Sequence, residues 1–267
     1  MTDPLFDEAL RSQRRDRASR GGSRPFLQQR AFDDIVDRLD FVRRDFRTAL
    51  LIGCPQKEWA AEIGKFAAER VDIVEPGRLF ARDCDALWAP EVRMEIAVGD
   101  YGLCVAVGTL DTVSDLPTAL LRIRIGLRPD ALLIGAMSGG DTLPRLRSAM
   151  RAADAVSGAA APHVHPRIEA SALAGLLVNA GFIDSVVDID RVSVSYERFG
   201  DLVRDLRSMG ATNVLSARPR EPLSKKALAA AKADFASENP AGRTLERFEI
   251  LHFSGWTGFS PEMPIQG

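Results

Sequence analysis

The chain has 267 residues, of which 46% are hydrophobic and 27% charged, a composition that is ordinary for a globular protein. Its formal charge of −2 gives no overall attraction to nucleic acid or to an anionic membrane. There is no run of about 18 apolar residues that would predict a membrane span. An acidic start without an apolar signal core, and three widely spaced cysteines that form no CxxC motif, lead us to expect a cytoplasmic protein.

The predicted elements alternate between strands and helices after two polar, Arg-rich helices at 3–20 and 25–44. Short apolar runs predict strands at 48–53, 70–75, 94–98, 103–108, 131–137, 184–196 and 247–256. Periodic stretches predict helices at 57–69, 78–88, 115–127, 169–180, 198–209 and 222–237. This alternation favours an α/β fold with a mostly parallel sheet, covered by helices on both faces. We expect one domain over 1–267, with an N-terminal helical arm (1–45) and a helical insertion (198–240) before the last strand.

The stretch TALLIGCPQKEWA, residues 48–60, ends the first predicted strand with a single glycine, Gly53. Ligands of parallel α/β sheets bind at the carboxyl ends of the strands, where glycines let the backbone approach them. Here Pro55 removes a backbone donor, and Lys57 and Trp59 add bulk where a cofactor would need space. A plain strand-turn-helix and an altered cofactor site both fit this pattern.

Two further strand ends bear on that choice. Glu75 ends the second strand, where an acid can accept hydrogen bonds from a ribose, or can simply be solvated. Gly108 and Thr109 end the fourth strand and are small enough to leave room over a ligand. Asp111 and Asp115 then follow as pocket groups or helix caps, and we expect Asp115 to cap the helix over 115–127.

The histidines do not predict a metal site. His163 and His165 stand two apart between prolines, no third ligand is evident, and His252 lies inside a strand as a packed residue would. The sequence has no GxSxG, HExxH or Walker motif, so it gives no support to a hydrolase or an ATPase.

Residues 135–147, GAMSGGDTLPRLR, resemble the GAMxGGDTLxxLR signature of the class I S-adenosylmethionine methyltransferase relatives that include complex I assembly factor 5. The family is akin to the malonyl-carrier-protein O-methyltransferases. The similarity covers nearly the whole chain: FDEALRSQRRDRA (6–18), LLRIRIGLRPDALLIGAM (120–137), HVHPRIEASALAGLLVNAGF (163–182), and later segments at 194–196, 205–213 and 242–256.

This resemblance implies a Rossmann-like sheet of seven strands with the last strand antiparallel. It also implies an S-adenosylmethionine pocket, formed here by Gly53, Cys54, Glu75, Gly108 and Thr109. However, the family's LDLGCGxG motif is reduced to Gly53 and Cys54. Leu51 replaces its acid, Pro55 and Lys57 replace its other glycines, and the adenine-side segment is largely missing. We therefore expect weak binding of S-adenosylmethionine and no metal.

Two functions follow from the resemblance. One is an S-adenosylmethionine-dependent methyltransferase that acts on a protein or a carrier protein. The alternative is a non-catalytic methyltransferase-like assembly or binding factor for respiratory complex I. In both cases we expect a protein partner and no nucleic acid, with Asp141 as a helix cap or a contact group. The resemblance identifies no catalytic residue; the predicted substrate or partner residues are Gly139, Gly140, Asp141, Thr142, Arg145, Tyr196, Asn213 and Trp256.

Overall fold

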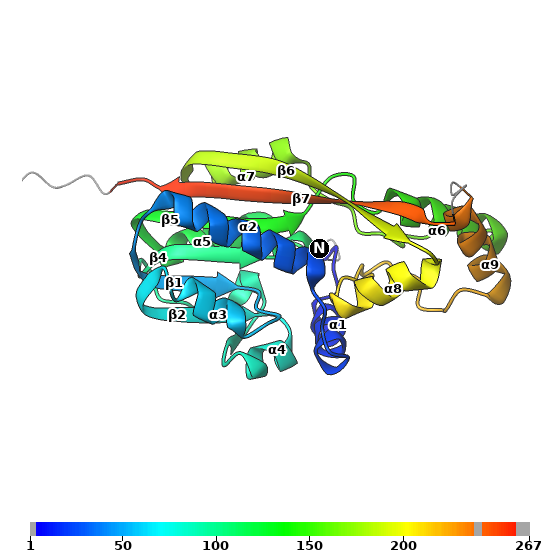
Figure 1. Cartoon of the computed structure of the whole chain (residues 1–267), viewed down its shortest axis with the longest axis horizontal. Coiled ribbons are helices and arrows are strands. Elements are labelled where there is room, and N and C mark those ends of the chain that lie inside the picture. The colour runs from blue at the N-terminus through cyan, green and yellow to red at the C-terminus, as the bar shows by residue number, and fades with distance from the viewer. Residues whose placement is uncertain (1–3, 238–241, 260–267) are drawn as a thin grey trace, which may run out of the picture.

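The computed structural model describes residues 4–237 and 242–259. Within this part of the chain, seven strands form one sheet in the order β3-β2-β1-β4-β5-β7-β6 (Figure 1). Strands β1 to β5 pair in parallel, whereas β7 runs antiparallel to both of its neighbours, as the resemblance implies. Their bounds are β1 (Phe46–Ile52), β2 (Ala67–Glu75), β3 (Leu87–Trp88), β4 (Tyr101–Val107), β5 (Leu127–Ser138), β6 (Phe182–Tyr196) and β7 (Thr244–Thr257).

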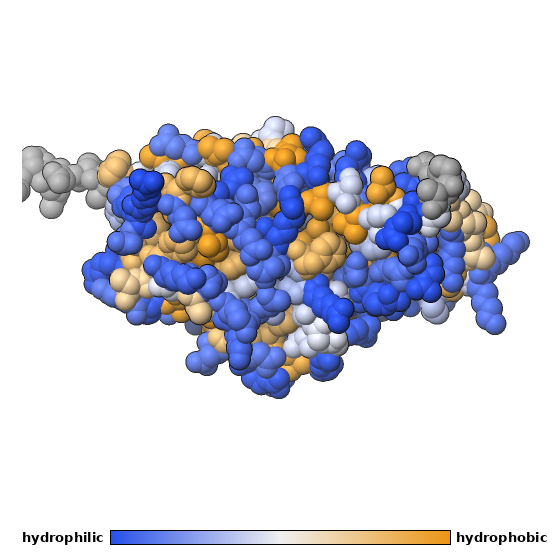
Figure 2. All heavy atoms as spheres, viewed as in Figure 1, coloured by the Kyte–Doolittle hydropathy of each residue, from blue (hydrophilic) through white to orange (hydrophobic). Residues whose placement is uncertain are grey.

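Helices cover both faces of the sheet. The described helices are α1 (Glu8–Arg20), α2 (Phe26–Val42), α3 (Glu58–Ile63), α4 (Arg78–Asp83), α5 (Leu116–Gly126), α6 (Pro144–Ser157), α7 (Ala170–Asn179), α8 (Phe199–Ser208) and α9 (Lys225–Ala236), with 3-10 turns at Glu91–Arg93 and Leu110–Thr112. Strand residues alternate between the faces. Thus Leu51 packs with α2 and α3, while Leu50 and Ile52 pack with α5 and α7. Hydrophilic residues cover much of the face on which α2 and α3 lie (Figure 2).

Helices α6, α8 and α9 form a helical lobe around the C-terminal end of β6 and the N-terminal part of β7. Their contacts centre on Phe199, Leu202 and Phe235, with Tyr196 and Phe248 contributed by the two strands. Figure 1 shows this lobe beside the sheet, with α1 close to α8. No helix of the described ranges, 4–237 and 242–259, is long and apolar enough to cross a membrane.

The prediction of a strand at 94–98 is wrong. The third strand is β3, inside the range that the sequence predicts as a helix over 78–88, because α4 ends at Asp83. Met94 is buried in the core, and the Cδ1 atom of Ile96 packs against Gly126 at the end of α5. The apolar alternation of 94–98 therefore reflects a loop packed on a helix and not strand pairing. The helix predicted over 57–69 likewise ends at Ile63.

Candidate cofactor site and adjoining cavity

Helix α1 buries arginines where most helices bury apolar side chains. Its buried residues are Arg11, Arg15 and Ala18, which share one face of the helix at spacings of four and three. Charged groups are stable in such positions only when they are paired and hydrogen-bonded. The partners of both arginines lie at the carboxyl end of the sheet.

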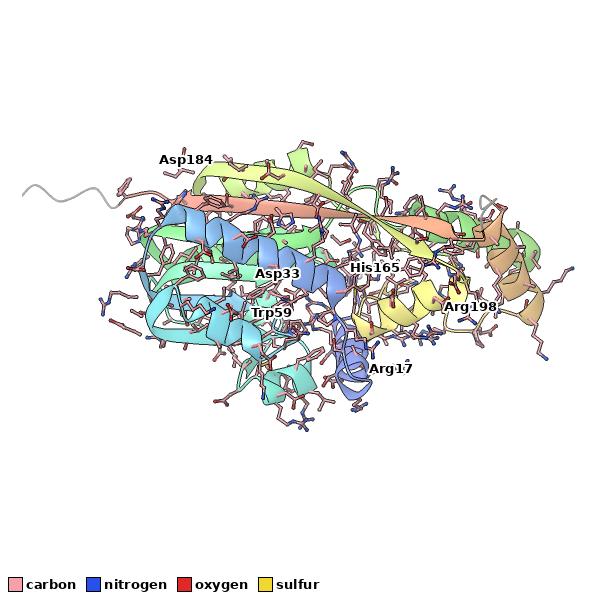
Figure 3. The ribbon with its side chains drawn as sticks, viewed as in Figure 1. Arg17, Asp33, Trp59, His165, Asp184 and Arg198 are labelled. Carbon is pink, nitrogen blue, oxygen red and sulfur yellow. The ribbon has the colours of Figure 1, made fainter. Side chains whose placement is uncertain are left out.

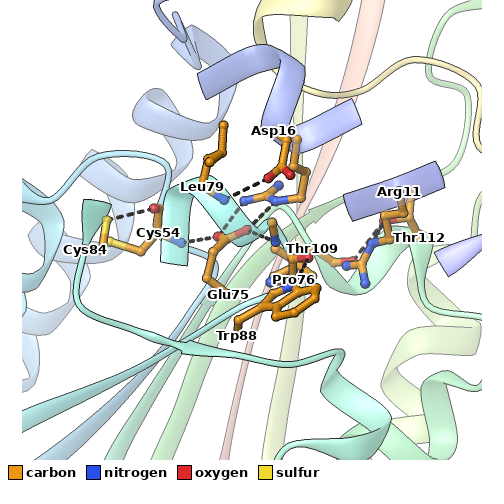
Figure 4. A network of polar contacts seen from close by, with 12 residues as sticks. Arg11, Asp16, Cys54, Glu75, Pro76, Leu79, Cys84, Trp88, Thr109 and Thr112 are labelled. Carbon is orange, nitrogen blue, oxygen red and sulfur yellow. Dashed lines mark hydrogen bonds and ion pairs between the residues drawn. The ribbon is translucent and has the colours of Figure 1, made fainter. Parts of the chain in front are cut away.

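Arg15 forms a two-point ion pair with Glu75, at the end of β2. Its Nε donates to Oε1 at 2.5 Å and its Nη2 donates to Oε2 at 2.7 Å. The Gly77 N–H also donates to Oε1 at 2.7 Å, and the Cys54 N–H donates to Oε2 at 2.9 Å (Figure 4). A carboxylate has about four acceptor positions, so these four donors saturate Glu75. Its side chain is fully buried.

Arg11 forms a second buried pair, with Glu91 in the turn after β3. Both guanidinium Nη atoms donate to the carboxylate at 2.7 Å, and Nη2 also donates to the Thr109 carbonyl at 2.6 Å. The Arg11 Nε donates to the Thr112 hydroxyl at 2.9 Å. Burial alone would raise the pKa of Glu91, but the charge and hydrogen bonds of Arg11 outweigh it and lower that pKa. Together the two pairs hold α1 across the strand ends.

The predicted cofactor residues come together around these pairs. Gly53 has φ of +84°, and a Cβ there would lie 2.5 Å from the Val107 carbonyl oxygen. A Cβ on Gly108 would lie 2.8 Å from Cγ of Gln28, on α2. The polar groups described above are used within the chain: the Cys54 N–H donates to Glu75, Glu75 also accepts from Arg15, and the Thr109 carbonyl accepts from Arg11. The five residues are therefore adjacent, and α1 and α2 cover the site that they form.

Lys57 and Trp59 do not obstruct this site, contrary to the prediction. The Trp59 ring is buried between α2 and α3, stacked on Phe32 at 4.3 Å between centroids, and its Nε1 donates to Gln29 at 2.8 Å (Figure 3). Lys57 is exposed. What fills the site is the pair of α1 arginines, which the sequence reasoning missed together with Glu91. Their spacing of four residues in FDEALRSQRRDRA was the available signal, but an exposed helix face gives the same pattern.

A cavity of about 90 Å³ adjoins the filled site, at the carboxyl ends of β4 and β5 and beneath α1, α2 and α8. Its wall is largely apolar, with Leu27, Met137 and Phe248 among the lining side chains. The polar or charged lining residues include Arg11, Arg15, Asp111, Thr142, His165, Arg167 and Glu249. A cavity with an apolar wall and a few convergent polar groups is a typical ligand site.

The charged groups of this cavity are mostly paired. Arg167 donates to the Asp111 carboxylate, and the Glu249 carboxylate contacts Nε of the exposed Arg191 at 3.3 Å. His165 accepts a hydrogen bond from the Val214 N–H at 2.9 Å, and burial lowers its pKa to about 3, so its ring is neutral.

His163 contacts Asp154 at 2.8 Å instead of joining His165, and His252 is buried as expected. Among the described residues there is no group of three side chains that could hold a metal ion.

The GGDTL turn, residues 139–143, packs tightly against β7. A Cβ on Gly139 would lie 2.3 Å from Leu251, and one on Gly140 would lie 1.9 Å from Glu249 Oε1. The Thr142 hydroxyl donates to the Gly139 carbonyl at 2.7 Å and accepts from the Glu249 N–H at 2.9 Å. This turn therefore fixes β5 against β7 at the cavity wall.

The expectation that Asp141 caps a helix is wrong. Helix α6 begins at Pro144 and has Leu143, in the left-handed region, at its N-cap, with no side-chain cap. Asp141 is exposed and pairs with Arg247. The N–H groups of Arg145 and Leu146 donate instead to Glu246 of β7, at 3.1 and 2.8 Å. In contrast, Asp115 caps α5 as expected, through the Thr118 N–H.

The remaining predicted partner residues are not gathered in one place. Tyr196 is buried in the helical lobe, and Asn213 bonds to the Pro162 carbonyl at 2.8 Å. Trp256 pairs with Leu132, near the amino end of the parallel strands, whereas the GGDTL turn follows Ser138 at the carboxyl end. Of the eight, Thr142 lines the cavity.

Comparison with known proteins gives a consistent set of relatives. The chain is 30% identical to the mitochondrial arginine-hydroxylase NDUFAF5 of Danio rerio over 265 residues, which cover 94% of this chain and 82% of that protein. It is 34% identical to the malonyl-[acyl-carrier protein] O-methyltransferase of Xylella fastidiosa over 180 residues, 67% of this chain and 58% of that protein. No protein-family model matches the chain.

Among solved structures, the fold is similar to that of the YcgJ protein of Bacillus subtilis. The TM-score is 0.57 at 9% identity, over 87% of this chain and 100% of that one. A methyltransferase-fold protein of Bacillus halodurans gives a TM-score of 0.54 at 8% identity, over 84% and 99% of the two chains. At such low identity the likeness concerns the fold alone.

Proposed function

The chain belongs to the methyltransferase-fold family that contains the arginine-hydroxylases NDUFAF5 and the malonyl-[acyl-carrier protein] O-methyltransferases, and we propose that it is a protein-binding assembly factor for respiratory complex I that does not use S-adenosylmethionine. The complex I partner is taken from the resemblance to complex I assembly factor 5. The lack of methyl transfer follows from the way the chain's own groups occupy Glu75.

The saturation of Glu75 by Arg15 and two backbone N–H groups carries this proposal. A ribose diol that bound Glu75 would have to displace Arg15 and leave a buried guanidinium without its partner. Breaking a buried ion pair in this way costs about 3–5 kcal/mol, which corresponds to an affinity loss of roughly 150- to 4,500-fold. We therefore expect S-adenosylmethionine to bind with a Kd weaker than about 100 μM.

The cavity beside α1 is the proposed contact site for the partner. It lies past the ends of β4 and β5, at the edge where ligands of parallel α/β sheets bind. The relatives named arginine-hydroxylases suggest an arginine side chain as the group that enters. The lining residue Glu249 supports this choice, because within the described part of the chain its carboxylate pairs with an exposed arginine, Arg191, at 3.3 Å. Thr142 and the exposed Asp141 belong to the same proposed surface.

Calorimetry with S-adenosylmethionine and with its demethylated product tests whether the protein lacks a functional cofactor site. For both compounds the Kd of the wild-type protein should be above about 100 μM. Arg15→Ala, which frees Glu75, should bind more tightly than wild type, whereas Arg17→Ala, which removes an exposed arginine from the same helix, should not (Figure 3). Low-micromolar binding by wild type would favour the methyltransferase function instead.

Complementation of a strain that lacks the gene tests the assembly role, with the amount of assembled complex I as the readout. Glu249→Gln should reduce assembly, since it removes the cavity carboxylate and nearly preserves side-chain size. Glu197→Gln is the matched control, because Glu197 is an exposed acid paired with Arg243 outside the cavity. Equal assembly by both variants, at equal protein levels, would contradict the cavity as the partner site.

A further inference from the structure

Two cysteines face each other across the loops that flank Glu75. Cys54 follows β1 by two residues, and Cys84 is the C-cap of α4. The Cys84 thiol donates to the Cys54 carbonyl oxygen at 3.2 Å (Figure 4). The Cys54 thiol donates instead to the Gln56 carbonyl at 3.1 Å. Cys84 packs against the same hydrophobic cluster that contains Cys54. The third cysteine, Cys104, lies within β4 in the cluster on the other face of the sheet.

We propose that Cys54 and Cys84 form a reversible disulfide, which makes this pair an oxidation site of the protein. The two cysteines stand beside regular elements, Cys54 two residues after β1 and Cys84 at the C-terminus of α4. Because the Cys84 sulfur already contacts the backbone of Cys54, the two sulfurs can approach each other through side-chain rotation.

The environments of the two thiols give them different roles. Cys84 is half-buried, so a small oxidant can reach it, while Cys54 is fully buried. The contact with the Cys54 thiol lowers the pKa of Cys84, and the same contact together with burial raises the pKa of Cys54. The thiolate is the reactive form of cysteine, so Cys84 is the attacking residue and Cys54 resolves the intermediate.

With oxidised glutathione as the oxidant, the reaction balances in two exchanges. The Cys84 thiolate attacks one glutathione sulfur, which forms a Cys84–glutathione disulfide and releases one glutathione thiolate. Cys54 then loses its proton and attacks the Cys84 sulfur, which releases the second glutathione. The protein gives up two protons and two electrons in all, and oxidised glutathione takes them up to become two reduced molecules.

Such a bond would connect the two segments that hold Glu75. The Cys54 N–H donates to one carboxylate oxygen, and the Gly77 N–H, just before α4, donates to the other. The disulfide would therefore fasten the loop after β1 to the far end of α4, beside the Arg15–Glu75 pair. Oxidation would make this part of the site more rigid.

Peptide mapping without reduction tests the proposal. The full chain is reduced, exposed to oxidised glutathione, alkylated and digested with trypsin. The expected product joins residues 48–57, TALLIGCPQK, to residues 83–93, DCDALWAPEVR, and disappears after treatment with dithiothreitol. The cysteine of the peptide that contains Cys104 should be neither linked nor glutathionylated, because that residue is buried in the core.

Two variants separate the steps. Cys54→Ser should accumulate the Cys84–glutathione adduct, and Cys84→Ser should give neither product; each variant is first compared with wild type by circular dichroism. If wild type stops at the Cys84 adduct, or if no linked peptide forms while the protein remains folded, the proposal is wrong. A link that involves Cys104 would also overturn it.

Discussion

Replacement of Arg15 by alanine tests whether the arginine face of α1 holds this helix on the sheet. The side chains of Arg15 and Glu75 are 6% and 0% exposed, so the pair is shielded from water. Removal of one partner from such a pair costs about 3–5 kcal/mol. Since Glu75 would keep the Cys54 and Gly77 N–H groups, we expect the lower end of this range. A loss of about 3 kcal/mol corresponds to a decrease in Tm of roughly 6–12 °C for a chain of this size.

Urea unfolding followed by circular dichroism measures this change. Arg17→Ala is the control, because Arg17 is exposed on the same helix and its loss should change the free energy of unfolding by less than about 0.5 kcal/mol. The double variant Arg15→Met with Glu75→Gln should recover part of the stability, since it removes both charges together and the glutamine carbonyl still accepts from one of the two backbone N–H groups. If Arg15→Ala and Arg17→Ala differ by less than about 0.5 kcal/mol, the buried pair does not hold α1 and our reasoning fails.

Three further predictions concern the cavity wall and the GGDTL turn. Because the pKa of His165 falls from 6.5 to about 3 on folding, the unfolded state takes up the proton first and stability decreases as pH falls below 6.5. Between pH 6.5 and 5 this amounts to about 2 kcal/mol. His165→Gln keeps an acceptor for the Val214 N–H and should remove that part of the pH dependence in urea titrations. Thr142→Val should destabilise the protein by about 1–3 kcal/mol, because it leaves buried backbone partners unsatisfied. Asp141→Ala should cost less than about 1 kcal/mol in thermal unfolding, since it removes an exposed ion pair. If Asp141→Ala destabilised the protein more than Thr142→Val, Asp141 would have to be regarded as a structural cap after all.

The sequence predicted the sheet well where burial on both faces leaves a clear signal. The runs that became β1, β4 and β5 are continuous and apolar, and the antiparallel last strand followed from the resemblance. It failed at 94–98, where Met94 and Ile96 have the alternation of a strand but pack on the core and on α5. Periodicity reports that a residue is buried, and it does not report whether the burying partner is a strand or a helix.

The residues at the strand ends of the candidate site could be predicted from the sequence, whereas the helix that covers them, α1, could not. Strand ends that neighbour one another in a parallel sheet must be adjacent, so Gly53, Glu75 and Gly108 could be grouped from their positions alone. The cover depends on contacts between residues that are far apart in the chain, such as Arg15 with Glu75. No local pattern encodes such a contact, and arginines four apart on a polar helix are compatible with full exposure.

The pairing of Glu75 also explains how an acid can stand at this strand end while Pro55 and Lys57 replace two glycines of the family motif. A carboxylate that serves a ribose needs an open, flexible loop beside it, because the ligand must approach the backbone. A carboxylate that serves Arg15 needs none, since the guanidinium reaches it from α1 and two backbone N–H groups complete its hydrogen bonds. Pro55, which has no backbone N–H to offer a ligand, fits the second role. In this chain the acid at the end of β2 is therefore evidence for the attachment of α1, and its presence alone does not argue for a bound nucleotide.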